Sequence, residues 1–193
     1  MGRIEPIGVR SWPPEMRAAM AAYRTPNPRH PFPAEDPDRP KGLNALGVLA
    51  HHPALATAYH HLVGHALFGT TLTPRQRELL VLRVAHRRQA TYEWAQHVYL
   101  AAEVGISAGE VDLVKSAAPA AAGWSAVEGA LLRAADELLD DARISDPTWA
   151  DLSAELDEQQ IMDAVFTVGA YDVLAMALRT FEVPIDDDLA PYA

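Results

Sequence analysis

Glu93 and His97 are the two side chains in this sequence best suited to moving a proton. They are four residues apart, so a helix places them on one face. Leu100 and Val104 continue that face as an apolar stripe, which predicts that the pair points inward. Burial raises a carboxyl pKa and a neighbouring imidazolium lowers it, so such a pair can move protons near neutral pH. Two other interpretations stay open: a helix-stabilising i,i+4 pair, and a buried ion pair without chemistry.

Glu78 is a second candidate acid, five residues after Thr73 on the preceding predicted helix. It shares a stripe with Leu82 and Ala85, which predicts a carboxyl group that faces the interior. The alternative is a first-turn acid stabilised by the helix dipole. Basic residues near the end of this helix complement the negative end of its dipole and are predicted to be structural. They are Arg83, Arg87 and Arg88.

Five histidines lie between residues 51 and 65. His61 and His65 have the i,i+4 spacing of two metal ligands on one helical face. A zinc protease site also needs a glutamate beside such a pair and a third ligand, and the local sequence supplies neither. We therefore expect no bound metal, and we predict that His65 lines a pocket.

Composition excludes several classes of function. The 193-residue chain has no cysteine, so disulfides, thiolate metal sites and thiol nucleophiles are excluded. Its net charge of −10 disfavours nucleic acid and anionic membranes as partners. The sequence contains no G-x-S-x-G elbow, no P-loop and no G-x-G-x-x-G fingerprint. Residues 1–9 do not resemble a signal segment, and Asp172 interrupts the apolar stretch 165–178, so we expect a cytoplasmic protein.

The elements that must position these residues are predicted to be helices. No segment alternates apolar and polar residues with period two, and start and stop signals mark about seven or eight helices. Thr91 and Asp146 are predicted to be the N-cap residues of two of them. Capping pairs three residues apart begin four others: Thr73 with Gln76, Ser107 with Glu110, Ser125 with Glu128, and Asp157 with Gln160. The sequence therefore predicts an all-α fold.

Two segments are predicted to lie outside these helices. Six of the fifteen prolines fall between Arg24 and Lys41 and exclude a helix there, so this segment is an arm or a loop. Residues 117–122 are predicted to form a second, alanine-rich loop.

The run Asp186 to Asp188 is predicted to be a solvated acidic end. Aromatic residues inside the helical patterns are expected in the core: Trp94, Trp124, Trp149, Phe166, Tyr171 and Phe181.

Two blocks of this sequence are similar to a known family. The first is L-T-P-R-Q-R-E-L-L-V-L-R-V-A, followed by Y-E-W-A-Q-H and A-A-E-V-G-I-S, and the second is V-G-A-Y-D-V-L-A-M-A-L-R-T-F-E-V-P-I. Both resemble the carboxymuconolactone decarboxylase family, which includes the AhpD-like alkylhydroperoxidases, over about residues 43–190. The resemblance implies an all-helical AhpD-like domain at residues 43–193. An N-terminal helix and a proline-rich arm at residues 1–42 precede it.

The peroxidase branch of that family carries a C-x-x-C pair that this chain lacks. The branch's motif places its glutamate on Glu78 and its relay histidine on His97. Its two cysteines fall on Ala90 and Glu93, and Tyr92 stands where the branch has another histidine. Both sulfurs are therefore absent, and the resemblance implies a member without thiol peroxidase activity.

The remaining groups predict proton chemistry without a metal or an organic cofactor. We expect decarboxylation or isomerisation of a small unsaturated lactone or keto acid, with Glu93 and His97 moving the proton. Glu78 and Tyr92 would orient or assist them. The alternative is a non-catalytic small-molecule-binding or structural oligomer of the same fold, in which the glutamate–histidine pair is a structural tie.

Residues outside this group are expected to contact the substrate or other subunits. His65 and Tyr171, the latter in the family's G-x-Y element, are candidate substrate-binding residues, and Arg179 departs from the family pattern, which has asparagine there. The resemblance implies a homo-oligomer, a trimer or a hexamer, with Leu174 and Leu178 available for an interface and the proline-rich arm along a neighbouring subunit. Expected partners are thus the chain itself and a small molecule.

Overall fold

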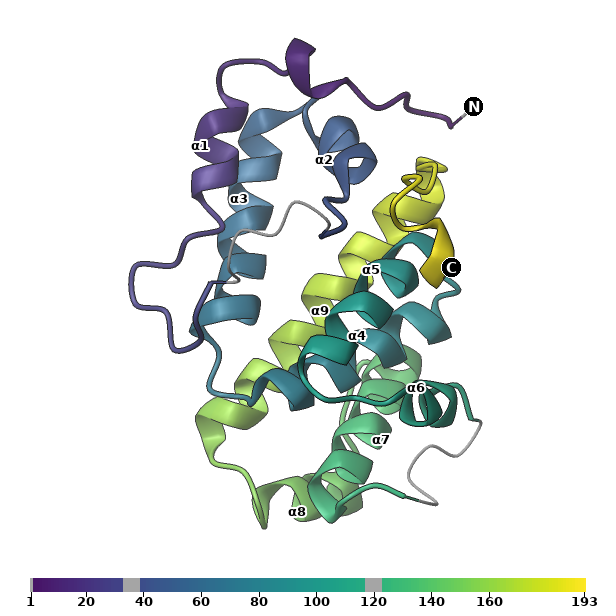
Figure 1. Cartoon of the computed structure of the whole chain (residues 1–193). Helices are drawn as coiled ribbons and strands as arrows, with labels where there is room; N and C mark the ends of the chain where they lie inside the picture. Colours follow the sequence, from purple (N-terminus) through teal and green to yellow (C-terminus); the bar gives the residue numbers. More distant parts are fainter. Residues whose placement is uncertain (1, 33–38, 117–122) are drawn as a thin grey trace.

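The computed structural model describes residues 2–32, 39–116 and 123–193, and within these ranges the chain is all-helical, as predicted. Its helices surround a central group formed by α4, α5, α7 and α9 (Figure 1). The α-helices are α1 (Met16–Ala21), α2 (Leu43–Leu49), α3 (Pro53–Gly64), α4 (Pro74–Arg87), α5 (Thr91–Glu103), α6 (Ala108–Val114), α7 (Ala126–Asp141), α8 (Asp146–Ser153) and α9 (Glu158–Thr180). Short helical turns cover Val9–Ser11, His65–Gly69 and Ala190–Tyr192.

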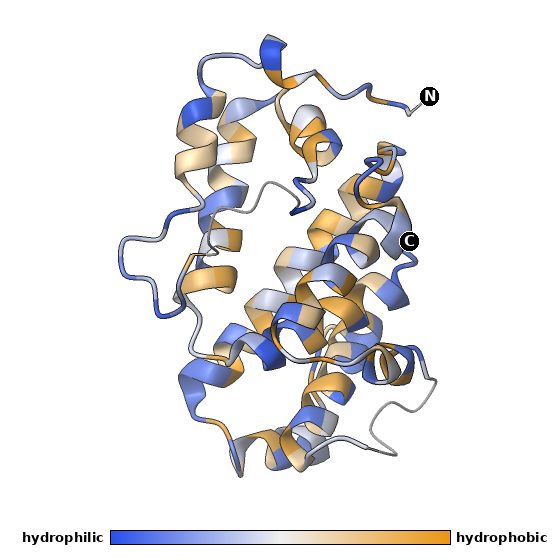
Figure 2. Cartoon of the chain, viewed as in Figure 1, coloured by the Kyte–Doolittle hydropathy of each residue, from blue (hydrophilic) through white to orange (hydrophobic). Residues whose placement is uncertain are grey.

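Helix α4 is the centre of the core. Every residue from Arg77 to Ala85 is buried, and α4 packs against α5, α7 and α9. Hydrophobic and hydrophilic residues are interleaved along the helices (Figure 2). Because α4 is covered on several sides, polar groups on it leave water when the chain folds, and each needs a partner inside the protein.

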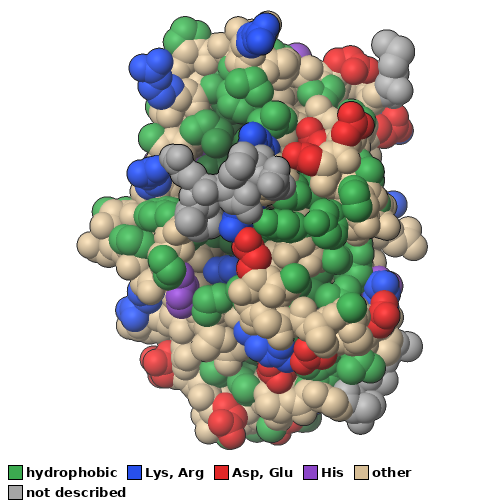
Figure 3. Space-filling model, viewed as in Figure 1, with side chains coloured by type: hydrophobic (Ala, Val, Ile, Leu, Met, Phe, Trp, Pro, Cys, Tyr) green, Lys and Arg blue, Asp and Glu red, His purple; other side chains and the backbone are tan. Residues whose placement is uncertain are grey.

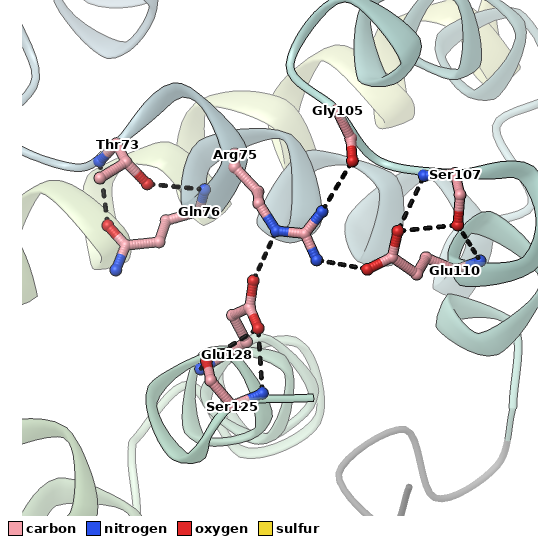
Figure 4. A network of polar contacts seen from close by, with 8 residues as sticks. All are labelled: Thr73, Arg75, Gln76, Gly105, Ser107, Glu110, Ser125 and Glu128. Carbon is pink, nitrogen blue, oxygen red and sulfur yellow. Dashed lines mark hydrogen bonds and ion pairs between the residues drawn. The ribbon is translucent and has the colours of Figure 1, made fainter. Parts of the chain in front are cut away.

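Local sequence signals begin these helices as predicted. The capping boxes at Thr73, Ser107, Ser125 and Asp157 are all formed, with the cap side chain and the side chain three residues later bonded reciprocally. Arg75 links two of these boxes, because its guanidinium donates to Glu128 at 2.7 Å and to Glu110 at 2.5 Å (Figure 4). The hydrogen bond from Arg75 and then the hydrogen bonds from Ser107 lower the pKa of Glu110 to about 2.

Two predicted helix starts are wrong by one residue. Helix α5 begins at Thr91 with Ala90 as its N-cap, and no side chain caps it. Helix α8 is capped by Ser145 rather than Asp146, because the Ser145 hydroxyl accepts from the backbone N–H of Thr148. In both cases the residue that looked like the cap already has helical geometry.

Helix α2 has no signal that our sequence analysis recognised. Gly42 precedes it in the left-handed conformation, with φ of +61°. This backbone conformation favours glycine, and a Cβ atom there would also lie 2.6 Å from the side-chain oxygen of Gln96, whose flexible end would have to move. Helix α3 ends at Gly64 and continues as a π-type turn over His65–Gly69.

In the N-terminal segment, helix α1 packs against α3. Met16 and Ala19 of α1 form a small apolar cluster with Ala50 and Ala56. The described parts of the proline-rich arm, residues 24–32 and 39–41, contain no helix. Residues 33–38 of the arm and the predicted loop 117–122 lie outside the described residues.

The arginines at the end of α4 form ion pairs with neighbouring helices. The prediction had assigned them only to the negative end of the helix dipole. Arg83 is 2% exposed and binds both oxygens of Asp136 on α7, at 2.7 and 2.8 Å. Arg87 binds Asp136 and Asp140, and Arg88 binds Asp172 of α9. The charges on one face of the molecule are otherwise of mixed sign and scattered (Figure 3).

Two core predictions on α8 and α9 are wrong. Trp149 and Phe166 are 50% and 57% exposed. Conversely, Leu178 is 6% exposed and packs inside the protein with Tyr92, so it is not available for an interface, and Leu174 packs against the same cluster. Helix α9 is long and apolar enough to meet a length-and-composition criterion for a membrane span, and half of that stretch is buried within the protein.

Candidate active site

The centre of the candidate site is a contact between α4 and α5. The Nδ1 atom of His97 lies 2.6 Å from Oε2 of Glu78. Glu78 is completely buried and His97 is 4% exposed, so the inward orientation predicted for both is confirmed. The expected partner of His97 was Glu93, one turn earlier on its own helix. The structure gives it a carboxylate from the neighbouring helix instead.

Arg77 completes this contact, and the sequence analysis did not identify it. Its Nε and Nη2 atoms lie 3.0 and 2.9 Å from Oε1 of Glu78, and its Nη1 donates to the carbonyl of Leu67 at 2.6 Å. Burial by itself would raise the pKa of Glu78, but His97 and Arg77 outweigh it and leave that pKa below its ordinary value. Glu78 is therefore a carboxylate at neutral pH.

An ionised Glu78 fixes the proton position on His97. A carboxylate only accepts hydrogen bonds, so the hydrogen between the two groups belongs to Nδ1 of the imidazole. The Nε2 atom is then the ring position that gains or loses a proton. A carboxylate that orients a histidine in this way is the arrangement found behind many general bases.

Glu93 has the opposite environment. It is 1% exposed, and neither of its carboxyl oxygens has a hydrogen-bond partner among the described residues. Burial, with a smaller contribution from the charge of Asp172, raises the pKa of Glu93 well above its ordinary value. These surroundings favour the neutral acid form of Glu93, which carries a proton that it can donate.

Tyr171 of α9 packs against His97. Its ring stands edge-on to the ring of His97, with 4.9 Å between centroids. Burial raises the pKa of Tyr171, and the charge of Glu78 adds to that effect. We call Glu78, Glu93, His97 and Tyr171, together with Arg77, the carboxyl–histidine cluster.

Tyr59 of α3 borders the cluster and was also missed from the sequence. Its hydroxyl donates to the carbonyl of Ala170 at 3.1 Å. Burial raises the pKa of Tyr59, with further contributions from Tyr171 and Glu93, which places the hydroxyl within electrostatic range of both. Four helices, α3, α4, α5 and α9, therefore contribute polar groups to one interior region.

Tyr92, predicted to assist the proton transfer, is held elsewhere. Its hydroxyl donates to Asp186 and accepts from the backbone N–H of Ala45, so it ties α5 to α2 and to the C-terminal segment. Burial and then the Asp186 hydrogen bond raise its pKa. The backbone N–H of Asn44 donates to the same Asp186 at 3.1 Å, so Asp186 is a structural acceptor and not a solvated end as predicted.

His65, a predicted pocket residue, lies towards the surface. Its side chain is 51% exposed, and its Nε2 atom lies 2.7 Å from Oδ1 of Asp163 on α9. Asp163 also accepts from the backbone and the hydroxyl of Thr71, at 2.6 and 2.7 Å. These contacts outweigh burial and lower the pKa of Asp163. No hydrogen bond or ion pair in the described residues joins His65 to the carboxyl–histidine cluster.

Two cavities lie outside the cluster. One of about 390 Å³ is lined mainly by acidic and polar residues of α7 and α8, including Glu137 and Asp146. The other, of about 510 Å³, lies between α1 and the start of α3 and includes His51 and His52. Among the described residues, no group of three or more histidine, aspartate or glutamate side chains is arranged to hold a metal ion.

Solved structures similar to this chain share its helical arrangement at low sequence identity. An uncharacterised peroxidase-related protein of Silicibacter sp. TM1040 is 14% identical with a TM-score of 0.69, and 86% of this chain and 95% of that chain are covered. An AhpD-core peroxidase-related protein of Ralstonia eutropha JMP134 is 18% identical with a TM-score of 0.67 and the same coverage.

A further similar structure contains a bound small molecule. It is a cysteine-to-alanine variant of the debrominase Bmp8 in complex with 2,3,4-tribromopyrrole, 12% identical with a TM-score of 0.73, and 98% of this chain and 94% of that chain are covered. Because all three identities are below 25%, these likenesses establish the AhpD-like fold alone. No curated protein matches the sequence.

A match to a protein family comes from the sequence and not from these structural likenesses. Residues 53–137 match the model of the carboxymuconolactone decarboxylase family, and that range contains Glu78, Glu93 and His97. The chain has no cysteine at the positions of the C-x-x-C pair or anywhere else. The central part of this protein, residues 53–137, therefore matches the carboxymuconolactone decarboxylase family, and the chain has an AhpD-like fold without the C-x-x-C pair.

Proposed function

We propose that this protein is a cofactor-free proton-transfer enzyme that decarboxylates or isomerises a small unsaturated lactone or keto acid. The observation that carries this proposal is Glu93, a buried carboxyl group without a hydrogen-bond partner among the described residues, one helical turn before a histidine that Glu78 orients. An unpaired buried polar group destabilises a folded protein, so its presence in a core calls for a function. A neutral carboxylic acid at pH 7 is suited to delivering a proton.

In the proposed decarboxylation, the bond between the substrate carbon and its carboxylate breaks and CO₂ leaves. The electron pair of that bond stays on the substrate and delocalises into the conjugated carbonyl group. Glu93 then donates its proton to carbon, which gives the product and a carboxylate on Glu93. In the isomerisation, a base first removes a proton from carbon, and an acid returns it at another carbon. Neither reaction changes the oxidation state of the protein.

His97 and Glu78 act as the second proton carrier in this proposal. Glu78 keeps the Nδ1 proton of His97 in place, so Nε2 can take a proton from solvent or substrate and restore the acid form of Glu93. Arg77 keeps Glu78 ionised throughout. Tyr92 and His65 keep the structural contacts described above and are assigned no step.

The comparisons support this choice of reaction class. The family is named for a lactone decarboxylase, and one structural neighbour is a debrominase bound to a small ring compound. Neighbours are also described as peroxidase-related, but a chain without cysteine cannot form the sulfenic acid or disulfide of a thiol peroxidase. We therefore expect no thiol-dependent peroxide reduction.

The test is turnover in D₂O with a panel of unsaturated lactone carboxylates and β-keto acids, followed by NMR. We expect CO₂ release or double-bond migration, with deuterium at one product carbon. Glu93→Gln and His97→Ala should each lower kcat by about 10²–10⁴-fold, the usual contribution of a positioned acid or base. Glu155→Gln, at an exposed glutamate, is the matched control and should retain full activity. Unchanged turnover of a confirmed substrate in both site variants would reject the assignment.

A second candidate is a small-molecule-binding protein without turnover. One observation favours it: Glu78 is fully buried and already bound by His97 at 2.6 Å and by Arg77 at 2.9 and 3.0 Å, as expected of a structural tie. In that case the panel would yield saturable binding by calorimetry with no deuterium exchange, and Glu93→Gln would alter affinity alone.

A further inference from the structure

Helix α9 presents an apolar face to the outside of the protein. Met162, Phe166, Val173 and Met176 are 60%, 57%, 53% and 53% exposed. With Gly169 they are spaced at four, three, four and three residues, so they form one continuous stripe along the helix. Single exposed apolar residues are ordinary on protein surfaces, but contiguous apolar patches mark sites of interaction.

Gly169 lies at the middle of this stripe and has no role within the described part of the chain. It is helical, and a Cβ atom added to it would meet nothing within 4 Å. Glycine inside a helix costs about 1 kcal/mol relative to alanine. Neither a tight turn nor a crowded neighbour in the described residues explains it. A glycine on an outer helix face does allow the backbone of another helix to approach closely.

The stripe is symmetric about Gly169. Met162 lies seven residues before it and Met176 seven after, while Phe166 and Val173 lie three before and four after. If two copies of α9 cross antiparallel at Gly169, Met162 meets Met176 of the partner subunit. Phe166 likewise meets Val173 of the partner subunit. An interface between identical subunits about a two-fold axis requires this kind of self-complementarity.

The charges at the ends of the helix fit the same arrangement. Glu158 lies eleven residues before Gly169 and Arg179 ten after, both are exposed, and neither forms an ion pair among the described residues. An antiparallel crossing places Glu158 near Arg179 of the partner subunit, and the reverse pair forms at the other end. Opposite charges thus meet twice, which favours the antiparallel pairing over the parallel one.

We propose that this face of α9 pairs antiparallel with the same face of a second copy of the chain, with Gly169 at the crossing point. Tyr171 projects from the opposite side of α9 into the carboxyl–histidine cluster, so pairing leaves the candidate site within each subunit. This inference does not depend on the proposed reaction.

Light scattering with size exclusion at micromolar concentration tests the pairing. The wild-type chain should have twice its mass of 21.0 kDa, or an even multiple of it. Phe166→Glu and Val173→Glu should raise the dissociation constant at least about tenfold, as expected for central apolar contacts. Leu55→Glu, at an apolar residue of α3 with 54% exposure, should change nothing. Circular dichroism checks that each variant is folded.

Two further tests distinguish this specific pairing from nonspecific association of apolar surfaces. Gly169→Gln has open space in the single chain and improves helix propensity, so we expect a more stable chain with a weaker interface. Glu158→Arg should weaken pairing, and the double variant with Arg179→Glu should restore it.

Three results would overturn the proposal. The first is a wild-type mass of one or three chains, and the second is an unchanged mass in Phe166→Glu. The third is sedimentation of the wild-type chain with phosphatidylcholine vesicles that Phe166→Glu abolishes, because the occupant of the face would then be lipid.

Discussion

Replacing Glu93 by leucine is expected to stabilise the protein and to abolish turnover together. Glu93 is 1% exposed, and neither carboxyl oxygen is hydrogen-bonded in the described residues, so its burial carries a desolvation cost without compensation. Removing an unsatisfied buried polar group is worth about 1–3 kcal/mol, and a chain of this size gains roughly 2–4 °C in Tm per kcal/mol. Calorimetry and the D₂O assay on Glu93→Leu measure both effects.

The stability that Glu93→Leu gains over the wild-type chain should increase with pH. Below about pH 4.3, the pKa of an unfolded glutamate, both states hold the proton and ionisation contributes nothing. Above it the unfolded state releases the proton while folded Glu93 keeps it, because burial raises its pKa. Wild type therefore loses stability as pH rises towards the folded pKa, and Glu93→Leu does not. A Tm difference that is constant between about pH 4 and pH 8 would contradict this assignment.

Replacing Glu78 by alanine should have the largest destabilising effect in the site. It leaves Arg77, at 8% exposure, and His97 without the carboxylate that binds both. Breaking a buried ion pair by removing one partner costs about 3–5 kcal/mol. Chemical denaturation at pH 7 measures the loss, with Glu155→Ala as the exposed control, expected within about 0.5 kcal/mol of wild type. A loss below about 1 kcal/mol would show that the contact is not formed.

The folded protein favours the ionised form of Glu78, whereas it favours the neutral form of Glu93. Because His97 and Arg77 lower the pKa of Glu78, its ionisation stabilises the folded state above the unfolded pKa of about 4.3. That contribution disappears as pH falls through the folded pKa. The difference between wild type and Glu78→Ala should therefore narrow in acid, where the difference for Glu93→Leu is also smallest.

Local signals were sufficient to predict most helices. The pairs Thr73 with Gln76 and Ser125 with Glu128 begin helices because their hydrogen bonds lie within four residues and need no tertiary contact. Helix α2 shows the limit of such signals. It begins at Gly42, whose left-handed conformation and closeness to Gln96 depend on a distant part of the chain.

The outward face of α9 was not predictable from the pattern of apolar residues. Leu178 and Phe166 are both apolar, yet one is buried and the other 57% exposed. Periodicity identifies a buried face only where the opposite face is polar. Because α9 is apolar on both faces, its orientation was fixed by packing against α4 and α7, which the sequence pattern does not encode.

The candidate site was predictable in its members on α4 and α5 but not in its connections. Helical spacing placed Glu78, Glu93 and His97 towards the interior. It could not show that His97 pairs with Glu78 across helices, 19 residues apart, and leaves Glu93 unpaired among the described residues. Arg77 was missed because a charged residue beside a buried acid has no periodic signal.

The central claim is that Glu93 is a neutral acid at physiological pH, and a carbon-13 NMR titration of its side-chain carboxyl group tests it most directly. Uniform labelling of glutamate and comparison with Glu93→Gln assign the resonance. We expect the Glu93 signal to stay at its protonated position at pH 7, well above the pKa of about 4.3 of a glutamate in an unfolded chain. A Glu93 signal that moves to its carboxylate position at about pH 4.3 would contradict the account.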